Sequence, residues 1–136
     1  MSRLSTAFVA DPELIEVLER RASPLVLSSN RIIFRQGDAS IGVFILTKGT
    51  ARLTRRSKGE EVLTVRVGSR SLLGLPAAIG AKSYSLTAEA VKGAQLSLLT
   101  AEHFLHLMHT EPDLSFRLLQ VLAAEVRFAR EVSSHQ

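Results

Sequence analysis

The sequence predicts a mainly β protein with helices at both ends of the chain. Between residues 23 and 99, short clusters of apolar and β-branched residues recur about every ten positions, and turn-forming residues separate them. Short strands at such regular spacing build sandwiches, jelly rolls or barrels. Before and after this region the apolar residues follow helical spacing. The 136 residues are enough for one hydrophobic core, so we expect a single domain over residues 1–136.

The first helix is expected over residues 11–22. The side chain of Asp11 can accept a hydrogen bond from a backbone N–H of the first turn, and Pro12 suits the first helical position because no N–H is needed there. The apolar residues that follow at helical spacing are Leu14, Ile15, Leu18 and Ala22.

The strand region, residues 23–99, is divided by pairs of turn formers. These pairs include Gly37-Asp38, Lys48-Gly49, Lys58-Gly59 and Lys92-Gly93. Leu63, Val65 and Val67 alternate with polar residues, and we expect their shared face to point into the core. Near residues 74–80 we expect a glycine-bearing loop.

Two helices are expected over residues 101–133. Thr100 caps the first of them, and Glu102 stands in its first turn, where a negative charge is favourable. Pro112 then begins a longer helix that reaches about Ser133.

The long helix carries two apolar stripes, whereas a helix on a protein surface needs only one. The first stripe comprises Leu114, Leu118, Val121, Phe128 and Val132, with Glu125 interrupting it, and the second comprises Leu119, Leu122, Val126 and Ala129. We expect one stripe to pack on the strands and the other on the same helix of a second copy. We assign the first stripe, Glu125 included, to a dimer interface over residues 113–133. The alternative is a wide helix that lies in a groove of its own domain.

The composition excludes several classes of function. Without cysteine the chain has no disulfide, thiolate metal site or cysteine nucleophile, which fits the reducing cytoplasm that we expect as its location. No apolar run is long enough to cross a membrane, so we expect no membrane association. The net charge of +4 favours weak attraction to anions but specifies no site.

No arrangement of residues predicts an enzyme. The sequence lacks a nucleophile elbow, a phosphate-binding glycine loop and a carboxylate pair suited to acid–base catalysis. His103, His106 and His109 could form a metal-binding face of a helix, but they fan over about 120° and have no fourth ligand. We therefore expect exposed histidines, and no catalytic residue, metal site or cofactor.

Residues 31–56, RIIFRQGDASIGVFILTKGTARLTRR, resemble the opening of the cyclic-nucleotide-binding domain of the Crp–Fnr (catabolite activator) regulator family. In that family a strand ends in a glycine-acidic turn, an aromatic-aliphatic strand follows, and a second glycine begins the next strand. Gly37-Asp38, residues 43–46 and Gly49 stand at these positions. The resemblance extends over nearly the whole chain. It implies an eight-stranded jelly roll, or double-stranded β-helix, with helices packed at its mouth.

The segment that binds the cyclic phosphate in this family departs from its usual pattern here. The family has glycine followed by glutamate and, further along the chain, arginine followed by serine or threonine. Gly74 and Ser85 match this pattern, but Leu75 replaces the glutamate and Tyr84 replaces the arginine. Leucine accepts no hydrogen bond from a ribose hydroxyl, and tyrosine carries no positive charge for the phosphate. We therefore expect no cyclic AMP binding in the usual mode.

The resemblance implies a pocket between residues 74–87 and the long helix. The candidate lining residues are Gly74, Leu75, Ala77, Ala78, Lys82, Tyr84, Ser85, Glu125 and Arg130. Lys82 or Arg130 could supply the positive charge that Tyr84 lacks.

The sequence therefore predicts a non-enzymatic regulatory or sensor module that is dimeric and has a small-molecule effector other than an ordinary cyclic nucleotide. The alternative is a ligand-free interaction module whose pocket is filled by Leu75, Ile79 and Tyr84. Transcription factors of the family continue from the long helix into a helix-turn-helix domain, whereas this sequence ends at Gln136. We therefore expect no DNA binding by this chain alone.

Overall fold

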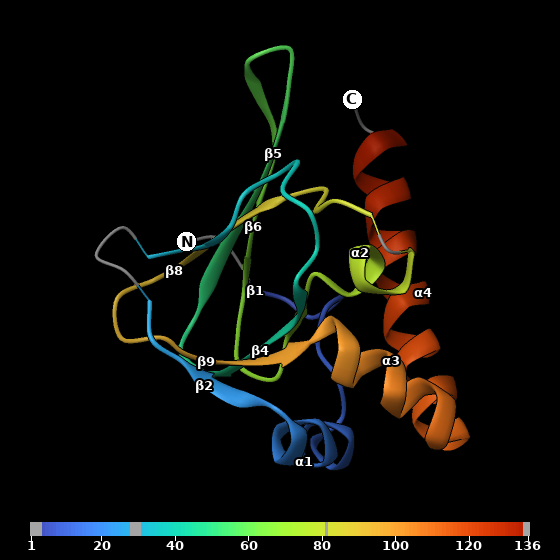
Figure 1. The fold of residues 1–136 in the computed structure, drawn as a ribbon. Coiled ribbons are helices and arrows are strands. Elements are labelled where there is room, and N and C mark those ends of the chain that lie inside the picture. The colour runs from blue at the N-terminus through green and yellow to red at the C-terminus, as the bar shows by residue number, and fades with distance from the viewer. Residues whose placement is uncertain (1–3, 28–30, 81, 135–136) are drawn as a thin grey trace.

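The computed structural model describes residues 4–27, 31–80 and 82–134, and it shows two β-sheets with helices beside them (Figure 1). One sheet has the order β1-β6-β5-β8-β3, formed by Leu4–Ser5, Glu60–Val67, Ala51–Ser57, Thr87–Ala90 and Ile32–Phe34. The other has the order β2-β9-β4-β7, formed by Ser23–Leu25, Gln95–Thr100, Gly42–Lys48 and Leu72–Leu73. The predicted mainly β jelly roll with helical flanks is confirmed. The described residues form nine strands rather than eight, because β1 adds a short parallel edge to β6.

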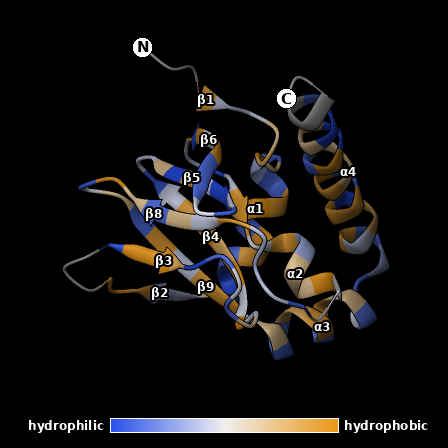
Figure 2. Ribbon diagram, turned by 90° about the horizontal axis from the view of Figure 1, so that it is seen from above, coloured by the Kyte–Doolittle hydropathy of each residue, from blue (hydrophilic) through white to orange (hydrophobic). Residues whose placement is uncertain are grey.

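The inner face of the β5–β6 hairpin follows the alternation expected from the sequence. Ala51 lies opposite Val67 in this antiparallel pair, and both are buried together with Leu53. Arg52 points away from the core and forms an ion pair of 2.5 Å with Glu89 of the neighbouring strand β8. The alternation of side chains therefore separates an apolar interior from a charged outer face, and Figure 2 shows both hydrophilic and hydrophobic residues along these strands.

Local capping residues determine where the helices begin. The helices are α1 (Pro12–Arg21), α2 (Leu75–Gly80), α3 (Ala101–Thr110) and α4 (Pro112–Ser134). The backbone N–H of Leu14 donates to Oδ1 of Asp11 at 2.9 Å, and the N–H of His103 donates to Oγ1 of Thr100 at 3.3 Å. Both predicted caps are confirmed. No helix of the described ranges is long and apolar enough to cross a membrane.

Residues 75–80 form the short helix α2, within the segment 74–80 where the sequence led us to expect a loop. The N–H of Ala78 donates to the carbonyl oxygen of Gly74 at 3.2 Å, which closes the first helical turn. The side chains of Leu75, Ala77 and Ala78 are buried. Apolar burial on this scale favours a compact turn over an exposed loop, and tertiary packing therefore overrides the glycines at the ends of the segment.

The long helix α4 packs its first apolar stripe on the core of its own chain. Leu114, Leu118 and Val121 are buried there with residues of α1 and α3, and Glu125 is buried as well. Side chains buried within one chain are not available to a second copy. The assignment of this stripe to a dimer interface is therefore corrected at these four positions.

The remaining residues of the two stripes differ in how far they are exposed. Phe128 of the first stripe is half-buried and contacts Phe8 edge-on, with ring centroids 5.8 Å apart. The side chain of Val132 lies outside the described residues. In the second stripe, Leu119 is 51% exposed and Val126 is 44% exposed. Leu122 of the same stripe is half-buried against the core, so the apolar face that α4 leaves free includes Leu119 and Val126 but not the whole second stripe.

Gly42, at the start of β4, is expected to tolerate no side chain. Its φ is +148°, and a Cβ there would lie 2.2 Å from the carbonyl oxygen of Leu99. We expect Gly42→Ala to lower the free energy of unfolding by several kcal/mol, measured by urea denaturation. The matched control is Gly37→Ala, because Gly37 has a φ of +94° but open space around its Cβ position. Backbone strain alone costs about 1–3 kcal/mol, and equal losses in the two variants would contradict the prediction.

Candidate ligand pocket

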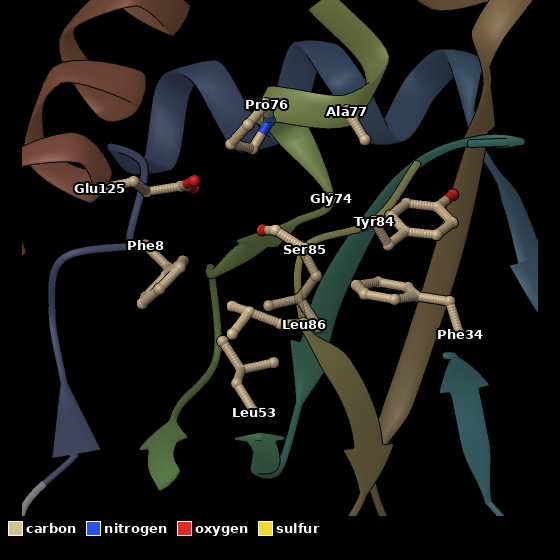
Figure 3. A pocket seen from close by; sticks show the side chains of 11 residues that line it. Phe8, Phe34, Leu53, Gly74, Pro76, Ala77, Tyr84, Ser85, Leu86 and Glu125 are labelled. Carbon is tan, nitrogen blue, oxygen red and sulfur yellow. The ribbon is translucent and has the colours of Figure 1, made fainter. Parts of the chain in front are cut away.

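Two pockets that share lining residues lie between α2, α4 and the segment that leads into β8, and we call them the inner and the outer chamber of one cavity. Figure 3 shows the side chains that line the inner chamber. The inner chamber has a volume of about 40 Å³ and the outer chamber a volume of about 230 Å³. The residues that line both chambers are Phe8, Pro76, Ser85, Leu86 and Glu125. The inner chamber adds Phe34, Leu53, Leu73, Gly74, Ala77 and Tyr84, and the outer chamber adds Arg55, Leu63, Val126, Phe128 and Ala129.

Tyr84 closes the inner chamber and is held on three sides. Its ring stacks on Phe34, with centroids 3.9 Å apart and planes inclined by 16°. Its hydroxyl donates to the carbonyl oxygen of Gly42 and accepts from the backbone N–H of Ile41, both at 3.0 Å. A Cβ on Gly74 would lie 2.7 Å from Cε1 of Tyr84, so the glycine makes room for the ring. The phenol hydroxyl therefore both donates and accepts a hydrogen bond within the protein.

Glu125 is the polar group that faces the cavity from α4. Its side chain projects between Phe8 and Pro76 in Figure 3, and the residue is only 6% exposed. Its Oε1 has no hydrogen-bond partner in the described part of the chain. Burial raises the pKa of Glu125 from 4.5 to about 8, because an apolar environment disfavours the charged form. The carboxyl group is therefore mostly protonated at neutral pH.

The charge distribution around the cavity is sparse. Of the described residues that line it, Arg55 is the one with a charged side chain at neutral pH, because Glu125 is mostly protonated, and Arg55 borders only the outer chamber. The inner chamber therefore offers one carboxyl group among mainly apolar side chains. Such a site can exchange hydrogen bonds with a ligand but offers an anion no opposite charge.

The structure brings together five of the nine predicted pocket residues. Those that line the inner chamber are Gly74, Ala77, Tyr84, Ser85 and Glu125. Leu75 is fully buried in the core beside α1 and α3, because it points to the other side of α2. Ala78 and Lys82 line a separate surface cavity beside α3, and Arg130 is exposed on α4 and lines neither chamber. Neither Lys82 nor Arg130 therefore takes the place of the family's arginine.

Several aromatic and apolar residues line this site without belonging to the predicted set. Phe8 lies between β1 and α1 and carries no motif, so only the folded chain shows that it lines both chambers. The inward orientation of Leu53 and Leu63 can be predicted from the sequence, because strand alternation places them on the inner face. Pro76 lies within the predicted segment but outside the predicted set of lining residues, and it lines both chambers.

The histidines of α3 lie away from this cavity. His103, His106 and His109 are all exposed, and neither chamber includes them. Within residues 4–27, 31–80 and 82–134, no group of three or more histidine or acidic side chains is placed to hold a metal ion.

Comparisons with known proteins identify the family. Residues 24–111 match the family model of the cyclic nucleotide-binding domain, so the chain belongs to that family. The predicted resemblance to Crp–Fnr regulators is confirmed. None of the curated proteins compared with the chain matches it.

Solved structures of regulators are similar to this chain. The catabolite activator protein of Thermus thermophilus aligns with a TM-score of 0.76 and 26% identity, covering 93% of this chain and 60% of that one. The N-terminal domain of a transcriptional regulator from Streptomyces coelicolor aligns with a TM-score of 0.65 and 23% identity, covering 89% and 85%. The c-di-GMP-responsive global regulator CLP of Xanthomonas campestris aligns with a TM-score of 0.73 and 15% identity, covering 92% and 62%. The last two show likeness of fold alone.

The raised pKa of Glu125 predicts a specific dependence of stability on pH. Between pH 4.5 and about 8 the folded protein holds a proton that the unfolded chain releases, so the free energy of unfolding falls as the pH rises through this window. Over the whole window the loss is roughly 4–5 kcal/mol. We expect Glu125→Gln, which stays neutral, to be more stable than wild type by an amount that grows from pH 5 to pH 9 in urea denaturation.

The control for this measurement is Glu60→Gln, because Glu60 is exposed at the start of β6. Its difference from wild type should stay small across the same pH range. A Glu125→Gln difference that does not change with pH would contradict the burial of an ionisable carboxyl group at this position.

Proposed function

We propose that this chain is the effector-binding module of a signal-responsive regulator, that it forms a homodimer through α4, and that its effector is not a cyclic nucleotide. The observation that carries the proposal is the buried carboxyl group of Glu125, which faces the cavity with an unpartnered oxygen. The similar structures are a catabolite activator and other regulators, one of them represented by its sensor domain. This supports a regulatory role rather than an enzymatic one.

The chemistry of the cavity argues against a cyclic phosphate. Tyr84 stands where the family's arginine would be, and its hydroxyl is already bonded to the backbone of residues 41 and 42. A charge-assisted hydrogen bond of the kind that arginine makes contributes roughly 1.5–3 kcal/mol. Glu125 supplies a carboxyl group instead, which becomes negative when it ionises and would then repel a phosphate. Both features favour an effector without a phosphate.

The position of α4 would allow the proposed effector to influence the rest of a regulator through this helix. The first half of the helix is anchored in the core through Leu114, Leu118 and Val121. The second half borders the outer chamber through Glu125 and Phe128. A molecule that enters this chamber must contact or displace the second half, while the first half stays fixed. The helix is thus placed to change its direction in response to the occupancy of the cavity.

The homodimer part of the proposal rests on the free face of α4. Phe116, Leu119, Ala123 and Val126 are exposed and follow one another at alternating three- and four-residue spacing. This spacing keeps apolar side chains on one side of a helix and is typical of two helices that pack along their length. We therefore propose that the same stripe of a second copy covers it.

A second candidate function, a dimerisation module without an effector, is favoured by one observation. Tyr84 and Phe34 stack at the cavity and leave an inner chamber of only about 40 Å³. The other two residues expected to fill the pocket are Leu75 and Ile79, and they pack instead in the core beside α1 and α3. The outer chamber of about 230 Å³ and the unpartnered oxygen of Glu125 favour the effector-binding function over this alternative.

Cyclic AMP and cyclic GMP at millimolar concentration are expected to leave the thermal midpoint of unfolding unchanged. A ligand present at 100 times its Kd stabilises the folded state by about 2.7 kcal/mol, which raises the midpoint by several degrees in a chain of this size. A rise with either nucleotide would contradict the proposal. Repeating the measurement on Lys82→Gln would then show whether Lys82 supplies the missing positive charge.

Leu119→Glu is expected to convert the dimer into a monomer, because it places a charge in the middle of the exposed stripe of α4. The mass in solution, measured by sedimentation velocity, should fall to that of one chain. The matched control is Leu105→Glu, since Leu105 is 45% exposed on α3 and lies outside the stripe. A wild-type protein of monomeric mass, or an unchanged mass in Leu119→Glu, would contradict the dimer.

A further inference from the structure

The walls of the cavity indicate an aromatic or similarly apolar ligand body. Phe8, Pro76 and Leu86 line both chambers, and Phe128 adds a second aromatic ring to the outer one. A cavity of about 150 Å³ with such a lining holds benzene. The outer chamber, at about 230 Å³, therefore has room for an aromatic ring with a short side chain.

Glu125 determines which polar group a ligand of this cavity should carry. The residue is 6% exposed, and its Oε1 lacks a hydrogen-bond partner among the described residues. An unpaired buried polar atom costs about 1–3 kcal/mol, and a ligand that pairs with it recovers part of this free energy. A protonated carboxyl group is both a donor and an acceptor, so its best partner is a group that also donates and accepts. Hydroxyl and carboxamide groups meet this requirement.

Charged groups suit the cavity less well. A ligand anion would meet no positive side chain in the inner chamber, whereas Arg55 borders the outer chamber, so an anionic probe tests whether Arg55 attracts an anion there. A ligand cation would bind well only to the ionised form of Glu125, and burial in apolar surroundings disfavours that form. An uncharged ligand requires neither an opposite charge nor the loss of a proton.

We propose that this cavity binds an uncharged, largely apolar molecule about the size of a phenylalkanol, whose single hydroxyl or carboxamide group exchanges hydrogen bonds with the carboxyl group of Glu125. The inference rests on the proposed function and names the chemical class of its effector. It predicts that the polar group of the ligand, and not only its apolar body, determines affinity.

Four probes of nearly equal size test this inference in the wild-type chain. They are 2-phenylethanol, ethylbenzene, 2-phenylethylamine and phenylacetate, which differ in carrying a hydroxyl, no polar group, a cation and an anion. Calorimetric titration at pH 7 should show the tightest binding for 2-phenylethanol. Its Kd should be about five- to tenfold lower than that of ethylbenzene, which is the contribution of one hydrogen bond.

Three variants assign this preference to Glu125. In Glu125→Leu the two uncharged probes should bind equally, because the polar partner is gone, and an apolar side chain at this buried position is compatible with folding. Glu125→Gln keeps a neutral donor and acceptor, so it should retain the preference. Ser85→Ala is the control, since Ser85 also lines both chambers and carries a hydroxyl, and it too should retain the preference.

The possible results separate the inference from the function on which it rests. Tighter binding of the amine or of phenylacetate would overturn the uncharged class of ligand and leave the effector-binding function standing. Equal binding of 2-phenylethanol and ethylbenzene to wild type, or an unchanged preference in Glu125→Leu, would overturn the role of Glu125 alone. Failure of all four probes to bind at millimolar concentration would overturn the inference and leave the effector-binding function standing, because that function does not require a phenyl-bearing effector.

Discussion

The side chain of Tyr84 joins the two sheets at the end of the jelly roll where the cavity lies. Its ring stacks on Phe34 of one sheet, and its hydroxyl donates to Gly42 at the start of β4 in the other. A buried phenol is stable when its hydroxyl is hydrogen-bonded, and here the hydroxyl both donates and accepts. Gly74 leaves the space that the ring occupies. One aromatic residue therefore closes this end of the roll with a side chain that offers no positive charge to the cavity.

The neutral state of Glu125 follows from its burial in apolar surroundings. An opposite charge nearby would lower the pKa of a carboxyl group, but Arg55 borders only the outer chamber and Tyr84 of the inner chamber carries no positive charge. With a neutral phenol there, burial alone acts on Glu125 and raises its pKa. The neutral phenol of Tyr84 and the neutral carboxyl group of Glu125 are thus physically consistent. Together they leave the inner chamber without a charged group among its described lining residues at neutral pH.

The elements that the sequence predicts correctly are those that local residues determine. Asp11 and Thr100 cap their helices through backbone groups three residues away, so no distant contact is needed. The two stripes of α4 are different, because both are apolar and only the position of α1 and α3 decides which one is buried. The residues that line the pocket are difficult to predict for the same reason. Gly74 and Leu75 are neighbours in the sequence, yet Gly74 lines the inner chamber whereas the side chain of Leu75 is buried in the core. Glu125 had a visible signal, since it interrupts an apolar stripe that proves to be buried.

The two faces of α4 meet at consecutive residues, and this links the cavity to the proposed dimer. Glu125 faces the cavity, while Val126 lines the outer chamber and also belongs to the exposed stripe. A helix turns by about 100° per residue, so a rotation that moves Glu125 toward a ligand also moves Val126 relative to a second copy. In the proposed dimer, occupancy of the cavity and the packing of α4 would therefore be coupled by the geometry of one helical turn. By the reciprocity of linked equilibria, a change in dimer affinity on ligand binding requires an equal change in ligand affinity on dimerisation.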